Sequence, residues 1–430
     1  MSLIKKNKIC IVGLGYVGIP LAMSFAKKNF QVTGFDIDKK KIDNLKKGID
    51  VTNEAKKYGI QNLKKINFTA DNTNLKNSNT FIITVPTPVD KNNIPDLTLL
   101  KKACILVGKN LNNGDLVILE STVYPLTTKN ICIPILEKYS QLNHLNNKNR
   151  NYKKKYFLCG YSPERINPGD KNRNLKNITK VISGSSKVAL SKIKFLYEKI
   201  CDRIYIAETI EVAEAAKIIE NTQRDVNIAL INEFQKIFNL LNINVYNVLK
   251  AAKTKWNFLN FEPGFVGGHC IGVDPYYLAY CAKKIGYNPK LILAGRKINN
   301  EVVDDFYIKI SNILKKNKIK QKDRILFVGA SFKENCNDIR NSKVIELAEK
   351  LNKNYNILIY DPNVDYFYLK QNTTCKVLKK IDKKKYSSII LANKHNFIKE
   401  QGLEKFKNKL LKNGKILDIK NVFNLYDDLI

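Results

Sequence analysis

The sequence predicts an α/β protein in which two Rossmann-like, doubly wound parallel-sheet domains are joined by a long central helix. Three observations predict it. Short runs rich in β-branched residues alternate with helical patterns up to about residue 200, and the same alternation returns after residue 324. Between them, residues 209–239 contain neither glycine nor proline and carry an apolar stripe at helical spacing. We therefore expect domains at 1–205, 206–316 and 317–430.

The composition describes a globular chain with a strong excess of positive charge. The 430 residues include 74 Lys and Arg against 39 Asp and Glu, which gives a formal net charge of +35. The basic residues are spread along the whole length and are not gathered with aromatics into one stripe, so we interpret them as a solvated surface that favours anionic small substrates. A basic nucleic-acid-binding protein on a Rossmann scaffold is the alternative from a different class.

The cysteines, histidines and apolar runs limit the class of protein to which the chain can belong. Nine cysteines without a CxxC pair suit a reducing compartment, and the sequence predicts no metal site. No run approaches the roughly 18 apolar residues of a membrane helix, and the first 25 residues do not resemble a signal peptide. We expect a cytoplasmic protein that needs no membrane.

The first strand, helix and second strand form a dinucleotide-binding pattern. An apolar run at residues 8–12 is followed at once by a G-x-G-x-x-G motif and then by a helical pattern at 20–28. The strand at 31–35 ends in Asp36, which follows Gly15 by 21 residues. A carboxylate there accepts hydrogen bonds from ribose hydroxyls and repels a 2′-phosphate, so NAD is predicted over NADP, with a flavin or non-nucleotide domain as the alternative. The motif residues expected to contact the cofactor are Gly13, Gly15, Tyr16, Val17 and Gly18.

Three further strands end in polar or proline-containing segments, and ligands of open parallel sheets bind at such carboxyl ends. The strand at 80–85 runs into Pro86 and Thr87, and the strand at 116–119 runs into Thr122 two residues after Glu120, so Pro86, Thr87 and Thr122 are candidate cofactor contacts. The strand at 156–159 is followed by Glu164 and Arg165. These two are either site residues or a plain surface ion pair.

On the long central helix, Lys217 and Asn221 are four residues apart and therefore share one face. A lysine and an amide together could stabilise a developing oxyanion, although an ordinary solvated helix face has the same pattern.

A glycine-rich stretch at 263–278 surrounds Cys270 with four glycines, which would let the backbone approach a ligand closely. The cysteine is either a nucleophile or a small buried hydrophobe. A helical region then extends to about residue 316. Strands are expected at 324–329, 356–360, 388–392 and 415–419, and the first of them runs into a loop that offers Lys333 and Arg340 to an anionic group.

Taken together, the motifs resemble the UDP-glucose/GDP-mannose dehydrogenase family over nearly the whole chain. They occur in family order: G-L-G-Y-V-G, V-P-T-P, S-T-V, S-P-E-R-x-N-P-G, A-K-x-x-x-N, G-G-H-C-I-G-V-D-P-Y-Y-L and F-K-E-N-C-x-D-I-R-N-S. The sequence around the cysteine and the F-K-E-N-C segment resemble those of a bacterial subgroup of the family. Enzymes of that subgroup oxidise UDP-N-acetylhexosamines, chiefly UDP-N-acetylglucosamine, for surface polysaccharides.

The resemblance implies a four-electron oxidation of a sugar C6 alcohol by two molecules of NAD. Cys270 would be the nucleophile that carries the thiohemiacetal and the thioester. Lys217 and Asn221 would hold the oxyanion, Asp274 would order a catalytic water, and Glu164 would assist hydrolysis of the thioester. Thr122 would lie near the nicotinamide. The implied substrate contacts are Glu164, Arg165, Lys217, Asn221, Gly267, His269, Lys333 and Arg340, the last two holding the uridine diphosphate.

Two departures from the family pattern and several alternatives accompany this interpretation. Leu126 follows Pro125 where the family usually has glycine, so the local turn near the cofactor is expected to differ. Asn260 stands where enzymes acting on UDP-glucose often carry lysine, which favours another substrate. UDP-N-acetylgalactosamine, UDP-N-acetylmannosamine and UDP-glucose remain alternatives. His269 is expected to have a structural or substrate-contact role, and no cation near Cys270 in the sequence accounts for an activated thiol. The family usually forms homodimers or larger homo-oligomers through the long helix.

Overall fold

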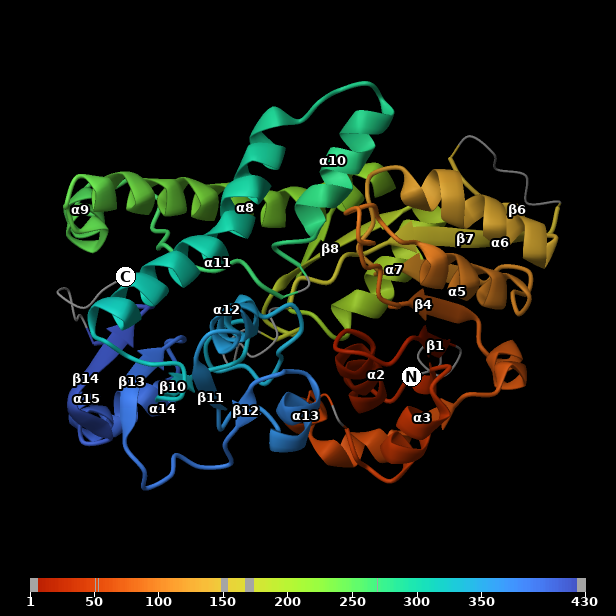
Figure 1. Cartoon of the computed structure of the whole chain (residues 1–430). Helices are drawn as coiled ribbons and strands as arrows, with labels where there is room; N and C mark the ends of the chain where they lie inside the picture. Colours follow the sequence, from red (N-terminus) through yellow and green to blue (C-terminus); the bar gives the residue numbers. More distant parts are fainter. Residues whose placement is uncertain are drawn as a thin grey trace. The chain divides into compact units, whose positions relative to one another are not determined.

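A computed structural model describes residues 7–50, 52, 54–147, 154–166, 174–268 and 270–423. The chain divides into two compact units (Figure 1). The first unit comprises Met1–Glu220 and Tyr276–Tyr287, and the second comprises Asn221–Pro275 and Asn288–Ile430. His269 and residues 167–169 of the S-P-E-R-x-N-P-G motif lie outside the described residues.

The sheet of the first unit has the strand order β3-β2-β1-β4-β5-β7-β8-β9, with β6 paired to β7, within the part of the chain that the structure describes. Every pair is parallel except β7 with β8, which confirms the predicted parallel sheet and adds one antiparallel pair. The order reverses between β1 and β4, which is where doubly wound folds bind their ligands. The strands are β1 (Lys8–Val12), β2 (Gln31–Phe35), β3 (Ile66–Thr69), β4 (Thr80–Ile83), β5 (Leu116–Leu119), β6 (Asn143–His144), β7 (Tyr156–Tyr161), β8 (Thr179–Gly184) and β9 (Arg203–Ile206).

The helices of the first unit connect these strands. They are α2 (Gly18–Lys27), α3 (Lys39–Lys46), α4 (Ala55–Tyr58), α5 (Thr98–Gly108), α6 (Ile133–Ser140) and α7 (Lys187–Glu198), with the 3₁₀ turns η1 (Ile60–Lys65) and η2 (Asn72–Asn77) and the π turn η3 (Thr128–Cys132). Most of α10 (Asp274–Lys284) also belongs to this unit.

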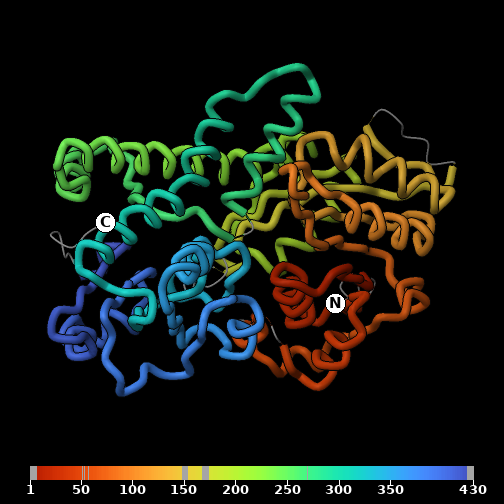
Figure 2. The backbone as a smooth tube through the Cα atoms, viewed as in Figure 1, coloured from red at the N-terminus to blue at the C-terminus, as the bar shows by residue number. Residues whose placement is uncertain are grey.

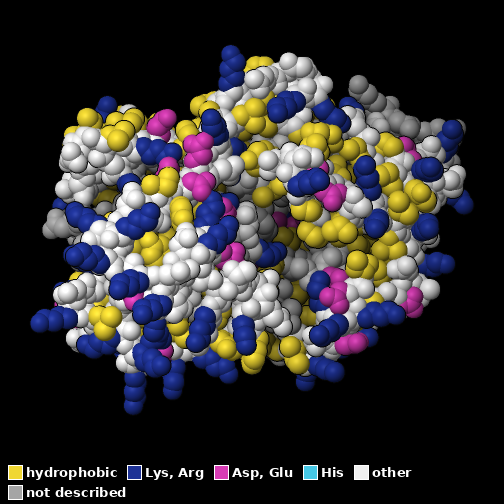
Figure 3. Space-filling model, viewed as in Figure 1, with side chains coloured by type: hydrophobic (Ala, Val, Ile, Leu, Met, Phe, Trp, Pro, Cys, Tyr) yellow, Lys and Arg dark blue, Asp and Glu magenta, His cyan; other side chains and the backbone are white. Residues whose placement is uncertain are grey.

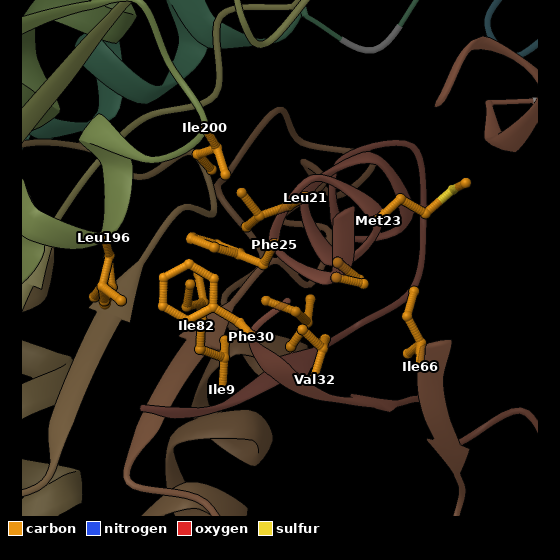
Figure 4. Packing of buried hydrophobic residues seen from close by; sticks show 14 of the residues in the cluster. Ile9, Leu21, Met23, Phe25, Phe30, Val32, Ile66, Ile82, Leu196 and Ile200 are labelled. Carbon is orange, nitrogen blue, oxygen red and sulfur yellow. The ribbon is translucent and has the colours of Figure 1, made fainter. Parts of the chain in front are cut away.

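The core of the first unit fixes α2 against the sheet. Phe25 of α2 lies edge-on to Phe30, with ring centroids 5.5 Å apart, and to Tyr197 of α7 at 6.1 Å. Figure 4 shows Phe25 and Leu21 turned towards apolar side chains from β1, β2 and α7. A Cβ on Gly18 would lie 1.9 Å from the carbonyl oxygen of Gly13, so only glycine lets α2 begin so close to the preceding loop.

The second unit contains a smaller sheet with the strand order β12-β11-β10-β13-β14, in which each pair is parallel. Its strands are β10 (Arg324–Val328), β11 (Asn356–Tyr360), β12 (Lys376–Val377), β13 (Tyr386–Leu391) and β14 (Leu410–Asp418). Its helices include α9 (Val245–Ala252), α11 (Lys290–Lys316), α12 (Lys343–Asn352), α13 (Tyr366–Gln371), α14 (Asn396–Gln401) and α15 (Leu403–Lys407). The apolar strands pack against α11, α12 and α13 in one cluster and against α14 and α15 in another, whereas α9 packs with α8 (Ile210–Leu240).

The long helix α8 matches the prediction of one helix at 209–239, and it continues from the first unit into the second. Within the second unit α11 packs across α8 (Figure 2). The contact is polar: Asp225 of α8 accepts hydrogen bonds from Arg296 at 2.6 Å and from Asn299 at 2.8 Å. Asn232 donates to the Asn299 side chain at 2.9 Å and to the Gly264 carbonyl at 3.1 Å.

Two features of the sequence composition reappear in the structure. Figure 3 shows Lys and Arg side chains spread over the whole face that is drawn. Among the described residues, nine non-glycine residues have positive φ, and six of these are asparagine: Asn29, Asn93, Asn242, Asn335, Asn341 and Asn421.

No helix within the described ranges is long and apolar enough to cross a membrane.

Candidate active site

The glycine loop after β1 is held in place by Asp36 at the end of β2. The Asp36 carboxylate accepts the Leu14 N–H at 2.9 Å and the Lys41 ammonium at 2.7 Å. Its other oxygen accepts the Asp38 N–H at 3.0 Å. Asp36 is buried, so the predicted ribose-reading residue also organises the loop that would face the cofactor.

The loop itself fits a dinucleotide. Gly13 has φ +100° and its N–H donates to the Phe35 carbonyl at 2.8 Å. A Cβ on Gly15 would meet nothing within 4 Å, so open space lies beside the loop. Backbone N–H groups that face open space at the start of a helix form a ready anion site, which is what a pyrophosphate needs. Tyr16 and Val17 are half-buried in the same loop.

The exits of β4 and β5 are tied together. The Thr87 hydroxyl donates to the Thr122 carbonyl at 2.6 Å, and the Ser121 hydroxyl donates to the Val85 carbonyl at 2.7 Å. The Tyr277 hydroxyl of α10 donates to the Thr87 carbonyl. The predicted cofactor contacts Thr87 and Thr122 thus lie together at the carboxyl edge of the sheet, with Pro86 exposed beside them.

Leu126, the departure noted in the sequence, takes the backbone geometry that glycine would favour. Its φ is +73°, and its side chain is exposed. Its N–H donates at 2.7 Å to Glu214 of α8, which also accepts the Thr128 N–H at 2.8 Å and the Thr128 hydroxyl at 2.6 Å. Burial raises the pKa of Glu214 to about 7, although these donors oppose the shift.

Glu164, after β7, belongs to a buried group of charges. One of its carboxylate oxygens accepts the N–H groups of Arg165 and Ile166, both at 2.6 Å. The other lies 3.5 Å from the ammonium of Lys180 on β8. Lys180 is fully buried and also pairs at 2.8 Å with Glu120, which is fully buried too.

The pKa values of both members of this pair are raised. Burial raises the pKa of Glu120, and the attraction of Lys180 acts against that rise. Burial acts to lower the pKa of Lys180, but Glu120 and then Glu164 outweigh it, so the net shift is upward. Lys180 is therefore a lasting cation beside Glu164. Neither Lys180 nor its pairing was predicted, because a lysine in a strand pattern gives no sign that it is buried.

The Arg165 guanidinium binds Glu220, whereas the Arg165 backbone N–H binds the Glu164 carboxylate. The guanidinium binds the Glu220 carboxylate at 2.8 Å and 3.2 Å and donates to the Thr179 carbonyl at 2.9 Å. These three bonds anchor it to α8 and to the start of β8.

Within the second unit, Asn221, Cys270 and Asp274 are brought together. The Asn221 amide donates to the Asp274 carboxylate at 2.5 Å. The Asp274 N–H donates at 2.8 Å to the Cys270 carbonyl, which also accepts the Val273 N–H at 3.0 Å. Asp274 is buried, whereas Cys270 is half-buried. Lys217 lies one helical turn before Asn221 on α8 and is half-buried.

A cation lies next to the cysteine loop through a contact that the sequence could not reveal. A Cβ on Gly272 would stand 3.5 Å from a terminal nitrogen of Arg296. Arg296 is buried on α11 and paired with Asp225 at 2.6 Å. The sequence around Cys270 contains no nearby cation. The Arg296 guanidinium supplies one beside Gly272, two residues after the cysteine.

The loop after β10 carries the two residues predicted to bind an anion. Lys333 is half-buried, with its ammonium 5.8 Å from the centroid of the Phe332 ring. Arg340 binds the buried Asp338 carboxylate through two nitrogens, at 2.6 to 3.1 Å, and its own side chain is 42% exposed. The same loop reaches Gly267 through Asn341, which was not predicted.

Comparisons with known proteins cover nearly the whole chain. Three models of the UDP-glucose/GDP-mannose dehydrogenase family match it: the NAD binding domain at residues 7–201, the central domain at 211–301 and the UDP binding domain at 326–425. The chain is 46% identical to a UDP-N-acetyl-D-glucosamine 6-dehydrogenase of Salmonella typhi and 45% identical to one of Pseudomonas aeruginosa, with 93% of each chain covered. Its structure is similar to that of a UDP-D-ManNAc dehydrogenase from Pyrococcus horikoshii, at TM-score 0.83 and 29% identity over 97% of this chain and 96% of that one.

Proposed function

Because the chain belongs to the UDP-glucose/GDP-mannose dehydrogenase family, we propose that this NAD-dependent nucleotide-sugar dehydrogenase oxidises a UDP-N-acetylhexosamine at C6, with UDP-N-acetylglucosamine preferred. The observation that supports this substrate is the 46% and 45% identity, over 93% of the chain, to two enzymes named for UDP-N-acetyl-D-glucosamine. Enzymes named for the mannosamine epimer are less similar, at 29% identity for that of Pyrococcus horikoshii and 33% for that of Methanococcus vannielii. UDP-N-acetylgalactosamine, UDP-N-acetylmannosamine and UDP-glucose are the alternatives.

The proposed chemistry centres on Cys270. Its thiolate would add to the C6 aldehyde, and loss of a hydride from the resulting thiohemiacetal would leave a thioester. Water would then attack the thioester carbon, the C–S bond would break, and the uronate would leave. NAD supplies the two-electron acceptor for each of the two oxidations.

The neighbouring residues have distinct proposed roles. The Asn221 amide, fixed by Asp274 at 2.5 Å, and the Lys217 ammonium would stabilise the oxyanion at C6. Asp274 would hold the attacking water, and Glu164, whose carboxylate lies 3.5 Å from the Lys180 ammonium, would accept its proton.

Binding residues are assigned in the same way. For the cofactor they are the loop of Gly13, Gly15, Tyr16, Val17 and Gly18, with Asp36, Pro86, Thr87 and Thr122. Lys333 and Arg340 would hold the diphosphate by charge-assisted bonds, and Arg165 and Gly267 would shape the sugar site. His269 is proposed as a substrate contact from its sequence motif alone.

The organisation and assembly of the chain are part of the proposal. We assign the domains to 1–205, 206–316 and 317–430. Exposed apolar side chains along α8 favour a homodimer or larger homo-oligomer: Val212, Ile219, Leu230, Ile237 and Leu240. Nine free cysteines suit the cytoplasm. Light scattering after gel filtration measures the number of subunits.

The deciding experiment supplies NAD with each UDP-hexosamine in turn and measures the ratio of NADH to uronate. Two NADH per uronate, fastest with UDP-N-acetylglucosamine, is the expected result. Cys270→Ser should abolish formation of the uronate. Faster turnover of another epimer would overturn the substrate, and unchanged uronate production by Cys270→Ser would overturn the thioester.

A further inference from the structure

Two loops of the second unit are joined by hydrogen bonds beside Cys270. The Gly268 N–H donates to the backbone carbonyl of Asn341 at 3.3 Å, and the Asn341 side-chain amide donates back to the Gly268 carbonyl at 2.9 Å. The two residues are 73 positions apart in the chain. This reciprocal pair fixes both polar backbone groups of a residue that lies two positions before the nucleophile.

The two hydrogen bonds between Gly268 and Asn341 depend on the backbone conformation of Asn341. Its φ is +52°, a left-handed value that asparagine tolerates better than other non-glycine residues. Gly268 has φ +77°. A Cβ on Gly267 would lie 2.8 Å from the Asn341 carbonyl oxygen, and one on Gly268 would lie 2.8 Å from the Phe332 ring. The two glycines therefore let the Phe332 to Asn341 loop close directly on the cysteine loop.

Phe332 and Asn341, which contact the two glycines, are adjacent in sequence to the residues expected to bind the diphosphate. Phe332 precedes Lys333, and Asn341 follows Arg340. Arg340 is itself held by the buried Asp338, whose carboxylate also accepts the Arg340 N–H at 3.0 Å. The hydrogen bonds between Arg340 and Asp338 thus hold the loop at the residue directly before Asn341.

We propose that Asn341 is a positioning residue that holds the cysteine loop so that the Cys270 thiol meets C6 of the bound sugar. This rests on the proposed function of Cys270 as the nucleophile. Asn341 acts through Gly268 and touches neither substrate nor cofactor in this role. Its removal should therefore slow the chemistry more than it weakens substrate binding.

The test compares Asn341→Gly with a matched control. Glycine accepts the left-handed backbone and removes the side chain with its amide, and the backbone freedom that it adds is shared by the control variant. Asn335→Gly is the control: Asn335 lies in the same loop with φ +54°, and its side chain bonds to Asn396 instead of the cysteine loop. Loss of one hydrogen bond, together with misplacement of the nucleophile, should lower kcat of Asn341→Gly about five- to tenfold, with KM changed less than about twofold.

A second measurement needs no substrate. Cys270 is alkylated with iodoacetamide and followed by peptide mass mapping, with half-buried Cys281 as the internal reference. We expect the ratio of the Cys270 rate to the Cys281 rate to rise several-fold in Asn341→Gly and to stay at the wild-type value in Asn335→Gly.

The outcomes separate this proposal from the proposed function. Unchanged kcat and an unchanged alkylation ratio in Asn341→Gly would overturn the positioning role, as would equal effects in both variants. If wild-type protein oxidises no UDP-hexosamine, the proposed function fails, and the alkylation ratio still decides whether Asn341 holds the loop.

Discussion

Replacing Lys180 by methionine would remove the cation that neutralises two carboxylates inside the first unit. Methionine is of similar length and carries no charge. Lys180 and Glu120 are fully buried with their charged atoms 2.8 Å apart, and Glu164 is 3.5 Å away. The substitution would leave Glu120 with the Tyr197 hydroxyl as a hydrogen-bond donor.

The expected loss of stability follows from the burial of the Glu120 carboxyl group without its partner. Removing one partner of a buried ion pair costs about 3–5 kcal/mol in free energy of unfolding. Burial already raises the pKa of Glu120, and the rise should be larger without Lys180. A carboxyl group with a raised folded-state pKa contributes most stability below its unfolded pKa of about 4.3, and that contribution is lost as pH rises through the folded value. The deficit of Lys180→Met should therefore grow from pH 5 to pH 8.

Urea denaturation followed by far-ultraviolet circular dichroism measures the deficit at each pH. The control is the double variant Lys180→Met with Glu120→Gln, which removes the stranded charge and should recover most of the loss. A deficit below about 1 kcal/mol, less than the smallest cost expected for a broken buried pair, would refute the reasoning. So would a deficit that does not change with pH, or a double variant no more stable than the single one.

Three other predictions concern the first unit. Leu126→Gly should raise the free energy of unfolding by about 0.5–1 kcal/mol, because glycine takes φ +73° without strain; thermal unfolding that shows a loss would contradict this. The pKa of Glu214 is raised to about 7, so wild-type protein should lose stability relative to Glu214→Gln as pH rises from about 4.5 to 7, and a pH-independent difference in melting temperature would count against it. Asp36→Ala should weaken NAD more than UDP-sugar in calorimetry, because Asp36 holds the glycine loop through Leu14; equal losses would mean that it does not serve the cofactor.

Local sequence patterns predicted most strands because each strand is a short apolar run bounded by polar residues. The run at 31–35 was predicted to its ends, as was that at 356–360. The strand predicted at 415–419 instead begins at Leu410, and that at 388–392 begins at Tyr386. The pairing of these two strands is irregular between Tyr386 and Ser388, and Gly414 interrupts the apolar pattern, so periodicity alone could not find their starts.

The site was predictable where a motif carries it and unpredictable where tertiary contacts do. Cys270 and its glycines stand out in the sequence. Lys180 and Glu120 are 60 residues apart, and nothing local indicates that they meet. Arg296 reads as one more basic residue on a helix, yet it lies beside Gly272. Asn341 belongs to the quoted F-K-E-N-C-x-D-I-R-N-S motif, but the motif does not reveal that its amide reaches Gly268, 73 residues away.

The asparagines at positive φ show how this fold uses an amino acid that is abundant in the chain. Left-handed positions ordinarily select glycine, and asparagine is the residue that can replace it at the smallest cost. Six left-handed positions in the described residues hold asparagine, so part of the asparagine content of the chain stands where few other side chains fit. None of the six precedes glycine, the neighbour beside which asparagine deamidates fastest. At Asn341 the side chain also supplies an amide that glycine could not, and this amide bonds to Gly268.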